Sequence, residues 1–227
     1  MPVKKTRGKF ITIEGLDGCG KSTQLERLAA VLRAGGLDVV VTREPGGTPT
    51  GEKIRHVLLD SHTSNLSPWT ELAMMFASRA QHIHEIILPA LNAGQWVLCD
   101  RFTDSSEAYQ GGGRKLGSEP VLRLHEILCA GLHPDMTILM VSDVAHSVAR
   151  ARKRNLARDP DSISDENRFE QENRAFFQRV LDKYLEIAQR EPGRVFAVDS
   201  KPPADVVHPL IVAEVRRRLT GQTARSA

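Results

Sequence analysis

The stretch that decides the fold is FITIEGLDGCGKST, residues 10–23. Its first four residues form an apolar, β-prone run, and its glycines then follow the spacing of a phosphate-binding P-loop, Gly15-x-x-x-x-Gly20-Lys21-Ser22. Glycines let backbone N–H groups curl into an anion-binding nest, and the helix that begins after the loop adds its positive dipole end. The stretch therefore predicts a strand, a loop that binds a nucleoside triphosphate, and a helix.

Two side chains of this loop have expected roles on the triphosphate. Lys21 should reach the β- and γ-phosphates, and the Ser22 hydroxyl should lie on Mg²⁺. With these two residues included, the full set of expected ATP contacts covers the whole loop: Gly15, Leu16, Asp17, Gly18, Cys19, Gly20, Lys21, Ser22 and Thr23. An ordinary glycine-rich turn is the alternative, and the strand before the loop argues against it.

Length and composition exclude several other classes. The chain has 227 residues, 41% hydrophobic and 26% charged, which suits a single globular domain over 1–227. A formal net charge of only +3 gives little support to nucleic-acid binding. Because no apolar run reaches membrane-spanning length and no signal-type segment opens the chain, we expect a cytoplasmic protein with no membrane partner. The three cysteines form no CxxC pair, so neither a disulfide framework nor a zinc site is indicated.

Strand-like and helix-like patterns alternate through the rest of the chain. Short apolar runs predict further strands at residues 39–41, 96–99, 136–141 and 195–198. Apolar residues at helical spacing predict a long helix over about 68–92 and a short helix over 104–110, which the three glycines at 111–113 should end. The order favours an α/β fold of three layers, a central parallel sheet of about five strands with helices on both faces. A polar tail over about 220–227 is expected to be disordered.

Polar residues follow three of the predicted strands. The P-loop, Arg43-Glu44 and Asp100-Arg101 all lie at carboxyl ends of strands, where ligands bind in parallel sheets, so they should converge on one cleft. Guanidinium groups match phosphate oxygens with paired hydrogen bonds, which makes Arg43, Arg55 and Arg101 candidates for a second phosphate. Surface ion pairing is the alternative for each arginine. Asp100 is expected either to hold Mg²⁺ through water or to pair with Arg101.

Three further motifs resemble the bacterial thymidylate kinase family. They are TREPGGT at 42–48, DRF at 100–102 and AYQGGGR at 108–114, and with the P-loop the likeness covers nearly the whole chain. The resemblance implies the P-loop nucleoside monophosphate kinase fold, ATP as donor, Mg²⁺ as cofactor, dTMP as acceptor and a homodimer. Asp17-Gly18 inside the P-loop is similar to the class in which a helpful arginine comes from a lid and not from the P-loop.

The resemblance also implies an acceptor pocket. Arg79 would hydrogen-bond a thymine carbonyl, while Ser106 and Gln110, four residues apart, would meet the base edge. Tyr109 would lie close to the deoxyribose and exclude a 2′-hydroxyl, with a half-buried structural tyrosine as the alternative. The expected set for dTMP is Asp17, Arg43, Glu44, Arg55, Met75, Phe76, Arg79, Arg101, Ser106, Tyr109 and Gln110.

The residue expected to stack on the base departs from the family pattern. The family usually has a phenylalanine four residues before the arginine, where this chain has Met75, and Phe76 is displaced by one. Either the ring of Phe76 or the thioether of Met75 would cover the base, and core packing is the ordinary alternative for a methionine.

A basic helix and its polar continuation complete the expected site. Arg150, Arg152 and Arg154 precede a polar stretch, which favours a lid over about 153–168 that closes over ATP, although a solvated basic face is the alternative. The expected catalytic residues are Lys21, Arg101, Arg154 and Asp17, where Asp17 would accept a hydrogen bond from the acceptor's 3′-hydroxyl or merely shape the turn. The expected metal ligands are Ser22 and Asp100. His82 and His84 point apart on a helix, so both are predicted to be structural or surface residues.

Two other functions stay open on these residues. One is a P-loop kinase with another acceptor, such as dUMP or dCMP. The other is a GTPase-like switch protein, which would carry a guanine-reading Asn/Thr-Lys-x-Asp motif after a late strand; the sequence has none.

Overall fold

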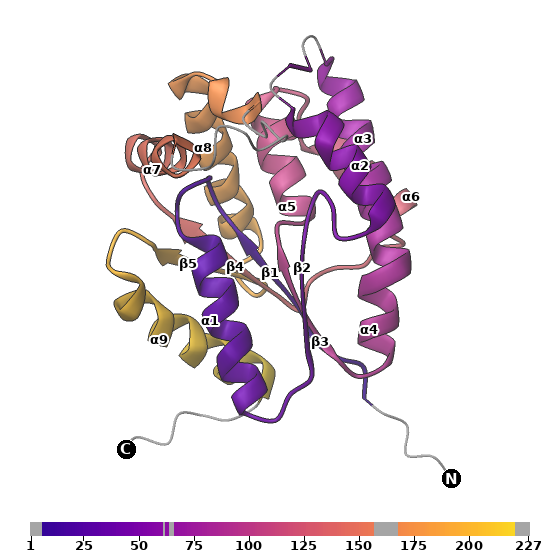
Figure 1. The fold of residues 1–227 in the computed structure, drawn as a ribbon, viewed down its shortest axis with the longest axis vertical. Coiled ribbons are helices and arrows are strands. Elements are labelled where there is room, and N and C mark those ends of the chain that lie inside the picture. Colours follow the sequence, from indigo (N-terminus) through magenta and orange to yellow (C-terminus); the bar gives the residue numbers. More distant parts are fainter. Residues whose placement is uncertain (1–5, 61, 64–65, 157–167, 221–227) are drawn as a thin grey trace.

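Helices cover both faces of a parallel sheet in the computed structural model of the protein (Figure 1). The structure describes residues 6–60, 62–63, 66–156 and 168–220, without the side chains of 151–156 and 170. The strands are β1 (Phe10–Glu14), β2 (Val39–Arg43), β3 (Trp96–Asp100), β4 (Met136–Val141) and β5 (Val195–Asp199). Their order is β2-β3-β1-β4-β5, and all neighbours pair in parallel. The predicted sheet of about five strands is confirmed.

The helices divide between the two faces of the sheet. They are α1 (Lys21–Ala34), α2 (Pro49–Leu59), α3 (Pro68–His82), α4 (Leu88–Asn92), α5 (Thr103–Ser106), α6 (Ser118–Leu128), α7 (Val144–Leu156), α8 (Arg174–Arg190) and α9 (Ala204–Val215). The first and last of these, α1 and α9, lie together on one face, and α3, α4, α6 and α8 lie on the other (Figure 1). The three-layer prediction therefore holds.

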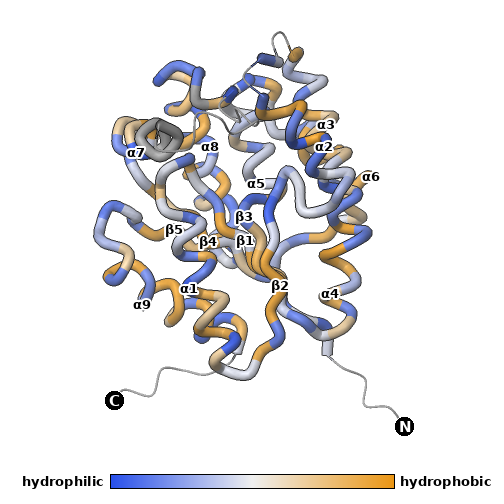
Figure 2. The backbone as a smooth tube through the Cα atoms, viewed as in Figure 1, coloured by the Kyte–Doolittle hydropathy of each residue, from blue (hydrophilic) through white to orange (hydrophobic). Residues whose placement is uncertain are grey.

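The central strand β1 explains why both faces are covered. Ile11 and Ile13 pack with Leu28 of α1 and Ile211 of α9, whereas Phe10 packs on the opposite side with residues of α3 and α4. All five residues of β1 are buried, because successive side chains of a strand point to opposite faces. Figure 2 shows the same pattern as hydrophobic strands in the middle of the molecule.

The predicted helix over 68–92 is continuous but not uniform. After α3 the chain forms a π-helical turn, Ile83–Ile87, and then continues as α4. Pro89 has no N–H group and would collide with the Glu85 carbonyl in a regular helix, so a wider turn just before it relieves the conflict.

The three glycines at 111–113 are the last residues of a helical segment, so the predicted break after Gln110 was wrong. The chain continues from α5 as a π-helical turn over Glu107–Gly113. A Cβ at Gly112 would lie 2.8 Å from Lys183 Cβ, and one at Gly113 would lie 2.6 Å from the Phe176 ring. Both neighbours belong to α8, so the glycines are there to let α8 approach closely.

Within the described residues, no helix combines the length and apolar character needed to cross a bilayer. The tail expected to be disordered falls, apart from its first residue, outside them.

Candidate active site

The P-loop connects β1 to α1 at the carboxyl edge of the sheet. Gly15, Gly18 and Gly20 have φ values of 136°, 83° and 101°, a region open mainly to glycine. A Cβ on Gly15 would lie 2.5 Å from the Met140 carbonyl oxygen, so the close turn needs this glycine. No side chain caps the first turn of α1, which leaves its N–H groups to a ligand.

Lys21 is folded back over this loop. Its side chain is only 6% exposed, and Nζ donates to the carbonyl oxygens of Gly15 (3.0 Å) and Leu16 (2.9 Å). Asp17 Oδ1 lies 3.8 Å from the same ammonium group. The Lys21 ammonium group is thus held against the backbone of the P-loop, a position that suits a cation for a bound polyphosphate.

Ser22 and Asp100 meet beside the loop. Ser22 Oγ donates to Asp100 Oδ2 across 3.3 Å, although the two residues lie on α1 and at the end of β3. Asp100 Oδ1 is buried without a hydrogen-bond partner among the described residues. A hydroxyl and a carboxylate with a spare oxygen are the hard ligands that Mg²⁺ takes, so these residues fit a magnesium ion.

Arg101 contacts four side chains beside the P-loop. Its guanidinium donates to Asp17 Oδ1 (2.8 Å), Ser105 Oγ (2.9 Å) and the hydroxyls of Tyr109 and Tyr184 (both 3.3 Å). Its backbone φ of 72° is uncommon for a residue with a side chain. Strain of this kind persists where the surroundings hold it, and it marks Arg101 as a functional candidate. The expected alternative, a pair between Asp100 and Arg101, gives way to the bonds of Arg101 with Asp17 and of Asp100 with Ser22.

The buried carboxylate of Glu14 binds Ser105 and Tyr184, which both contact Arg101. This role for Glu14 was not predicted from the sequence. Glu14 accepts hydrogen bonds from Phe102 N (2.7 Å), Ser105 Oγ (2.5 Å) and the Tyr184 hydroxyl (3.0 Å). Burial, and next the charge of Asp104, raise the pKa of Glu14 to about 7. A glutamate at the end of an otherwise apolar strand was the signal. Tyr184 carried no such signal, because its spacing fitted a core helix.

Arg79 is buried in α3, with 2% of its surface exposed. Nε donates to Glu44 Oε2 (2.6 Å), and Nη2 donates to Phe102 O (3.1 Å) and Ser106 Oγ (3.0 Å). Nη1 is buried and has no partner among the described residues. One N–H group of a fixed guanidinium is thus left over for a ligand.

Among the described residues, Arg79 has an unpaired donor, whereas Gln110 has an unpaired acceptor. Its Nε2 donates to Glu71 Oε1 across 2.8 Å, while its Oε1 is buried with no partner in the described part of the chain. Ser106, the residue that Arg79 contacts, lies four residues earlier on the same helical segment. An unpaired donor and an unpaired acceptor therefore come from neighbouring parts of the fold.

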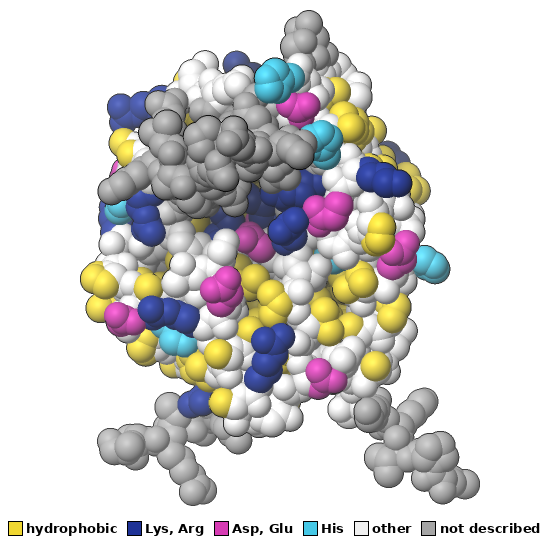
Figure 3. All heavy atoms as spheres, viewed as in Figure 1, with side chains coloured by type: hydrophobic (Ala, Val, Ile, Leu, Met, Phe, Trp, Pro, Cys, Tyr) yellow, Lys and Arg dark blue, Asp and Glu magenta, His cyan; other side chains and the backbone are white. Residues whose placement is uncertain are grey.

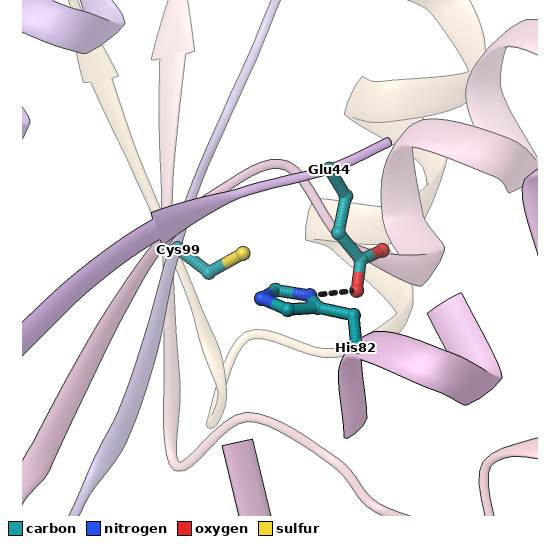
Figure 4. Close-up of side chains that lie close together, drawn as sticks. All are labelled: Glu44, His82 and Cys99. Carbon is teal, nitrogen blue, oxygen red and sulfur yellow. Dashed lines mark hydrogen bonds and ion pairs between the residues drawn. The ribbon is translucent and has the colours of Figure 1, made fainter. Parts of the chain in front are cut away.

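Glu44 is held by two side chains of α3, and its expected contact with dTMP stays a prediction. It is 3% exposed, and both oxygens are engaged, Oε2 by Arg79 and Oε1 by His82 Nδ1 at 2.9 Å (Figure 4). His82 Nε2 in turn lies 2.6 Å from Thr42 Oγ1. Glu44 therefore orients the Arg79 guanidinium. His82 is structural, as predicted, and His84 is exposed.

Figure 4 also places Cys99 beside His82 and Glu44. Their potential ligand atoms lie within 4.8 Å of one another, the one such trio among the described residues. Glu44 and His82 already hydrogen-bond each other, Cys99 Sγ donates to Arg101 O (3.0 Å), and the Arg79 guanidinium sits next to Glu44. A neighbouring positive charge opposes a cation, so this trio serves as a support for Arg79.

The structure separates the two candidates for covering the base. Phe76 is 0% exposed and packs in the core with Phe10 and Phe102, under the Arg79 guanidinium at 4.6 Å. The Phe76 ring has no exposed face in this structure, which favours Met75, and the stacking residue stays a prediction. Met75 instead packs in the cluster of Tyr109, on the cleft side of α3.

Tyr109 is buried and lies against Arg101. Its hydroxyl accepts from Arg101 and donates to Asp17 Oδ2 (3.5 Å), and the Arg101 guanidinium lies 5.0 Å from its ring centre. Burial raises the pKa of its hydroxyl, which stays protonated. The ring borders the same cleft as the P-loop aspartate.

Arg43 and Arg55 lie near the loop that follows β2. Arg43 pairs with Glu52 at 3.0 Å in an exposed position, and Arg55 donates to the Pro45 carbonyl oxygen (3.0 Å). Figure 3 shows Lys and Arg side chains gathered in the hollow on this side of the molecule.

Most of the expected lid lies outside the described residues. Arg154 belongs to α7, and its side chain is not among those described, while Arg150 is exposed.

Comparison with known proteins agrees with this geometry. A family model described as thymidylate kinase matches residues 13–211. The thymidylate kinase of Alkalilimnicola ehrlichii is 45% identical over 96% of this chain and 99% of its own, and that of Bordetella pertussis is 48% identical with the same coverage. The crystal structure of thymidylate kinase from Ehrlichia chaffeensis superposes with a TM-score of 0.72 at 30% identity, covering 92% of this chain and 99% of that one.

Proposed function

The chain belongs to the thymidylate kinase family and phosphorylates dTMP to dTDP with ATP, and we propose that the cleft between the P-loop and Arg79 is where it does so. The acceptor is a phosphate oxygen that is already anionic, so the reaction needs no general base. The difficulty is to bring two polyanions into line, which requires positive charge in fixed places. Other acceptors and a GTPase-like switch are not favoured by these relatives.

The donor side of the cleft consists of the P-loop. Its amides and the uncapped start of α1 would bind the phosphates of ATP, and Lys21 would exchange its carbonyl partners for the β- and γ-phosphates. Ser22 and Asp100 would hold Mg²⁺, which when bound neutralises charge on the phosphates. The unpartnered Asp100 oxygen supports this assignment.

The acceptor side is carried by one observation, the buried and unpartnered pair of Arg79 Nη1 and Gln110 Oε1. The edge of thymine offers a carbonyl oxygen, O4, next to an N–H group, N3–H. A donor from Arg79 and an acceptor from Gln110 complement that edge, and buried polar groups without partners are costly until such a ligand arrives. Met75 would cover the face of the base, as a flexible thioether in place of a ring.

The sugar and the acceptor phosphate lie between the two sides. Asp17 would accept the 3′-hydroxyl, and Tyr109 would occupy the space of a 2′-hydroxyl. Arg101 would bind the acceptor phosphate, with Arg43 and Arg55 approaching from the loop after β2. Arg154 of α7 is proposed on the resemblance alone as the lid arginine that stabilises the transferring phosphoryl group.

Acceptor kinetics test the proposed pocket. Arg79→Lys keeps a charge for Glu44 but loses the planar fork, so we expect KM for dTMP to rise roughly tenfold or more with a smaller change in KM for ATP. Arg174→Lys, on the first turn of α8, is a matched control and should change neither. An unchanged KM for dTMP in Arg79→Lys would remove the base-reading assignment.

For the lid, Arg154→Ala should lower kcat by about 10³-fold while dTMP affinity stays the same.

A homodimer is proposed from exposed apolar side chains. Val57 of α2, Trp69 of α3, Leu88 of α4, and Ile127 and Leu128 of α6 are 36–72% exposed. These helices lie together on one flank of the sheet (Figure 1). Met75 and Phe76 of α3 are buried and do not belong to this face. Trp69→Glu with Ile127→Asp should convert the protein to a monomer in sedimentation experiments, and an unchanged mass would exclude this face.

Because ATP and dTMP are its substrates, we place the enzyme in the cytoplasm.

A further inference from the structure

Glu71 lies in the first turn of α3 and is completely buried. A carboxylate in such a place needs close partners, because an unpaired buried charge costs several kcal/mol. Its partners come from two segments. Gln110 and Arg114 lie at the end of the π-helical turn, and Arg168 begins the short helix before α8. Glu71 has no place in the proposed contacts with either substrate, so its burial calls for another reason.

The two arginines account for the charge of Glu71. Arg114 Nη2 lies 3.1 Å from Oε2, and Arg114 Nε lies 3.2 Å from both oxygens. Arg168 Nη1 lies 2.8 Å from Oε2. Arg114 also pairs with Glu172 through Nη1, so the cluster as a whole is close to neutral. Neither arginine needs Gln110 for its own pairing.

Gln110 is the neutral partner, and its bond to Glu71 has a directional consequence. A primary amide can present its oxygen or its NH₂ group to a given side, and the two differ little in shape. An ionised carboxylate only accepts, so Glu71 takes the NH₂ side of Gln110 at 2.8 Å. The amide oxygen is thereby turned away from Glu71, and it is the atom that is buried without a partner.

We propose that Glu71 is a positioning residue that sets which base the acceptor pocket admits, by fixing the orientation of the Gln110 amide. This inference rests on the acceptor pocket proposed above. With the amide fixed, the pocket presents an N–H group from Arg79 and an oxygen from Gln110. Thymine and uracil complement that order with O4 and N3–H.

Cytosine presents the reverse order, an amino group and a bare ring nitrogen. It would set its amino group against Arg79 and its ring nitrogen against the Gln110 oxygen, leaving buried groups unpaired, which is the strongest basis for rejecting an analogue. A Gln110 amide free to turn would offer its NH₂ group to the cytosine nitrogen and remove one of the two conflicts. Glu71 prevents that turn.

The test is the ratio of kcat/KM for dTMP to kcat/KM for dCMP. Glu71→Gln should lower this ratio by roughly tenfold or more, because a neutral amide at 71 accepts either orientation of Gln110. The same substitution made together with Gln110→Leu should add nothing to the ratio of Gln110→Leu alone. Glu172→Gln is the matched control, since it removes a carboxylate from Arg114 without touching Gln110, and it should leave the ratio unchanged.

A second variant covers the case in which Glu71→Gln does not fold. Glu71→Asp keeps the charge for both arginines but withdraws the carboxylate from Gln110, and it should lower the ratio in the same direction. Equal losses with dTMP and dCMP in a folded Glu71 variant would overturn the proposal. If Gln110→Leu itself leaves the ratio unchanged, the acceptor pocket is wrongly placed. If Gln110→Leu lowers the ratio and the Glu71 variants do not, only the role of Glu71 fails.

Discussion

Arg79 and Glu44 form an ion pair of 2.6 Å in which each side chain is 2% exposed. Glu44 also accepts from His82, so one carboxylate on the loop after β2 holds two residues of α3. We expect Glu44→Ala to lower the free energy of unfolding by about 3–5 kcal/mol, because it leaves a buried guanidinium without its partner. Urea unfolding measures this.

Surface pairs supply the comparison for that prediction. Arg123 and Glu119 lie 3.4 Å apart but are 72% and 80% exposed. Arg123→Ala should change stability by less than about 1 kcal/mol. Similar losses for the two variants would show that the Glu44 pair is not held in a low-dielectric interior.

Glu14 should make stability depend on pH. Its pKa rises from an ordinary value of 4.5 to about 7 on folding, chiefly because it is buried. Between these values the folded protein binds more protons than the unfolded chain, so the contribution of Glu14 is most favourable below pH 4.5 and declines as pH rises through 7. The loss is roughly 3 kcal/mol at high pH.

Glu14→Gln isolates this effect, because the amide cannot ionise. The stability of the variant relative to the natural protein should increase between about pH 5 and pH 8 by up to roughly 3 kcal/mol in urea titrations. A difference that is the same at every pH would mean that Glu14 titrates normally in the folded protein.

The close packing of α8 on the glycines at 111–113 predicts that a side chain there lowers the free energy of unfolding. Gly113→Ala would place a Cβ 2.6 Å from the Phe176 ring, so α8 must move, and we expect a loss of about 1–3 kcal/mol in thermal or urea unfolding. Gly193→Ala is the control, since a Cβ there meets nothing within 4 Å. Equal stability of the two variants would contradict the close approach of α8.

The metal assignment predicts a changed magnesium requirement. Asp100→Asn keeps the shape of the side chain but removes its charge, so half-maximal velocity should need about tenfold more Mg²⁺ or beyond. Asp182→Asn, on the exposed side of α8, should leave that concentration unchanged. Chelation of Mg²⁺ should abolish phosphoryl transfer in the natural protein. An Asp100→Asn enzyme with an ordinary magnesium curve would place the ion elsewhere.

Local patterns were enough to predict the strands, the P-loop and the edge where the site lies. The spacing of Gly15, Gly20 and Lys21 after a strand favours a P-loop over an ordinary turn, and parallel strands bring Asp100 and Arg101 to the same edge. Pairings between distant segments could not be predicted this way. Nothing local tells that Glu44 pairs with Arg79 and His82, because these partners come from a helix far along the chain.

Two further features of the structure depend on tertiary neighbours that the sequence does not reveal. The glycines at 111–113 look like a helix break after Gln110 until α8 is seen to pack on them, and Phe76 looks like a base-stacking ring until Phe10 and Phe102 enclose it. In each case a tertiary neighbour decided between two locally reasonable conformations. Glu14 was overlooked for a related reason, since its donors lie far along the chain.

The bond between Arg101 and Asp17 ties the two substrates together. Asp17 belongs to the loop for the donor, and Arg101 is the cation proposed for the acceptor phosphate, so a phosphate that engages Arg101 competes with its 2.8 Å bond to the loop. In the proposed site, the P-loop loses this contact when Arg101 turns to the acceptor phosphate. If that loss changes the affinity for ATP, bound ATP changes the affinity for dTMP by the same factor, because the coupling free energy is the same in both directions. An inhibitor built for the acceptor pocket would then bind with a strength that depends on how much ATP is present.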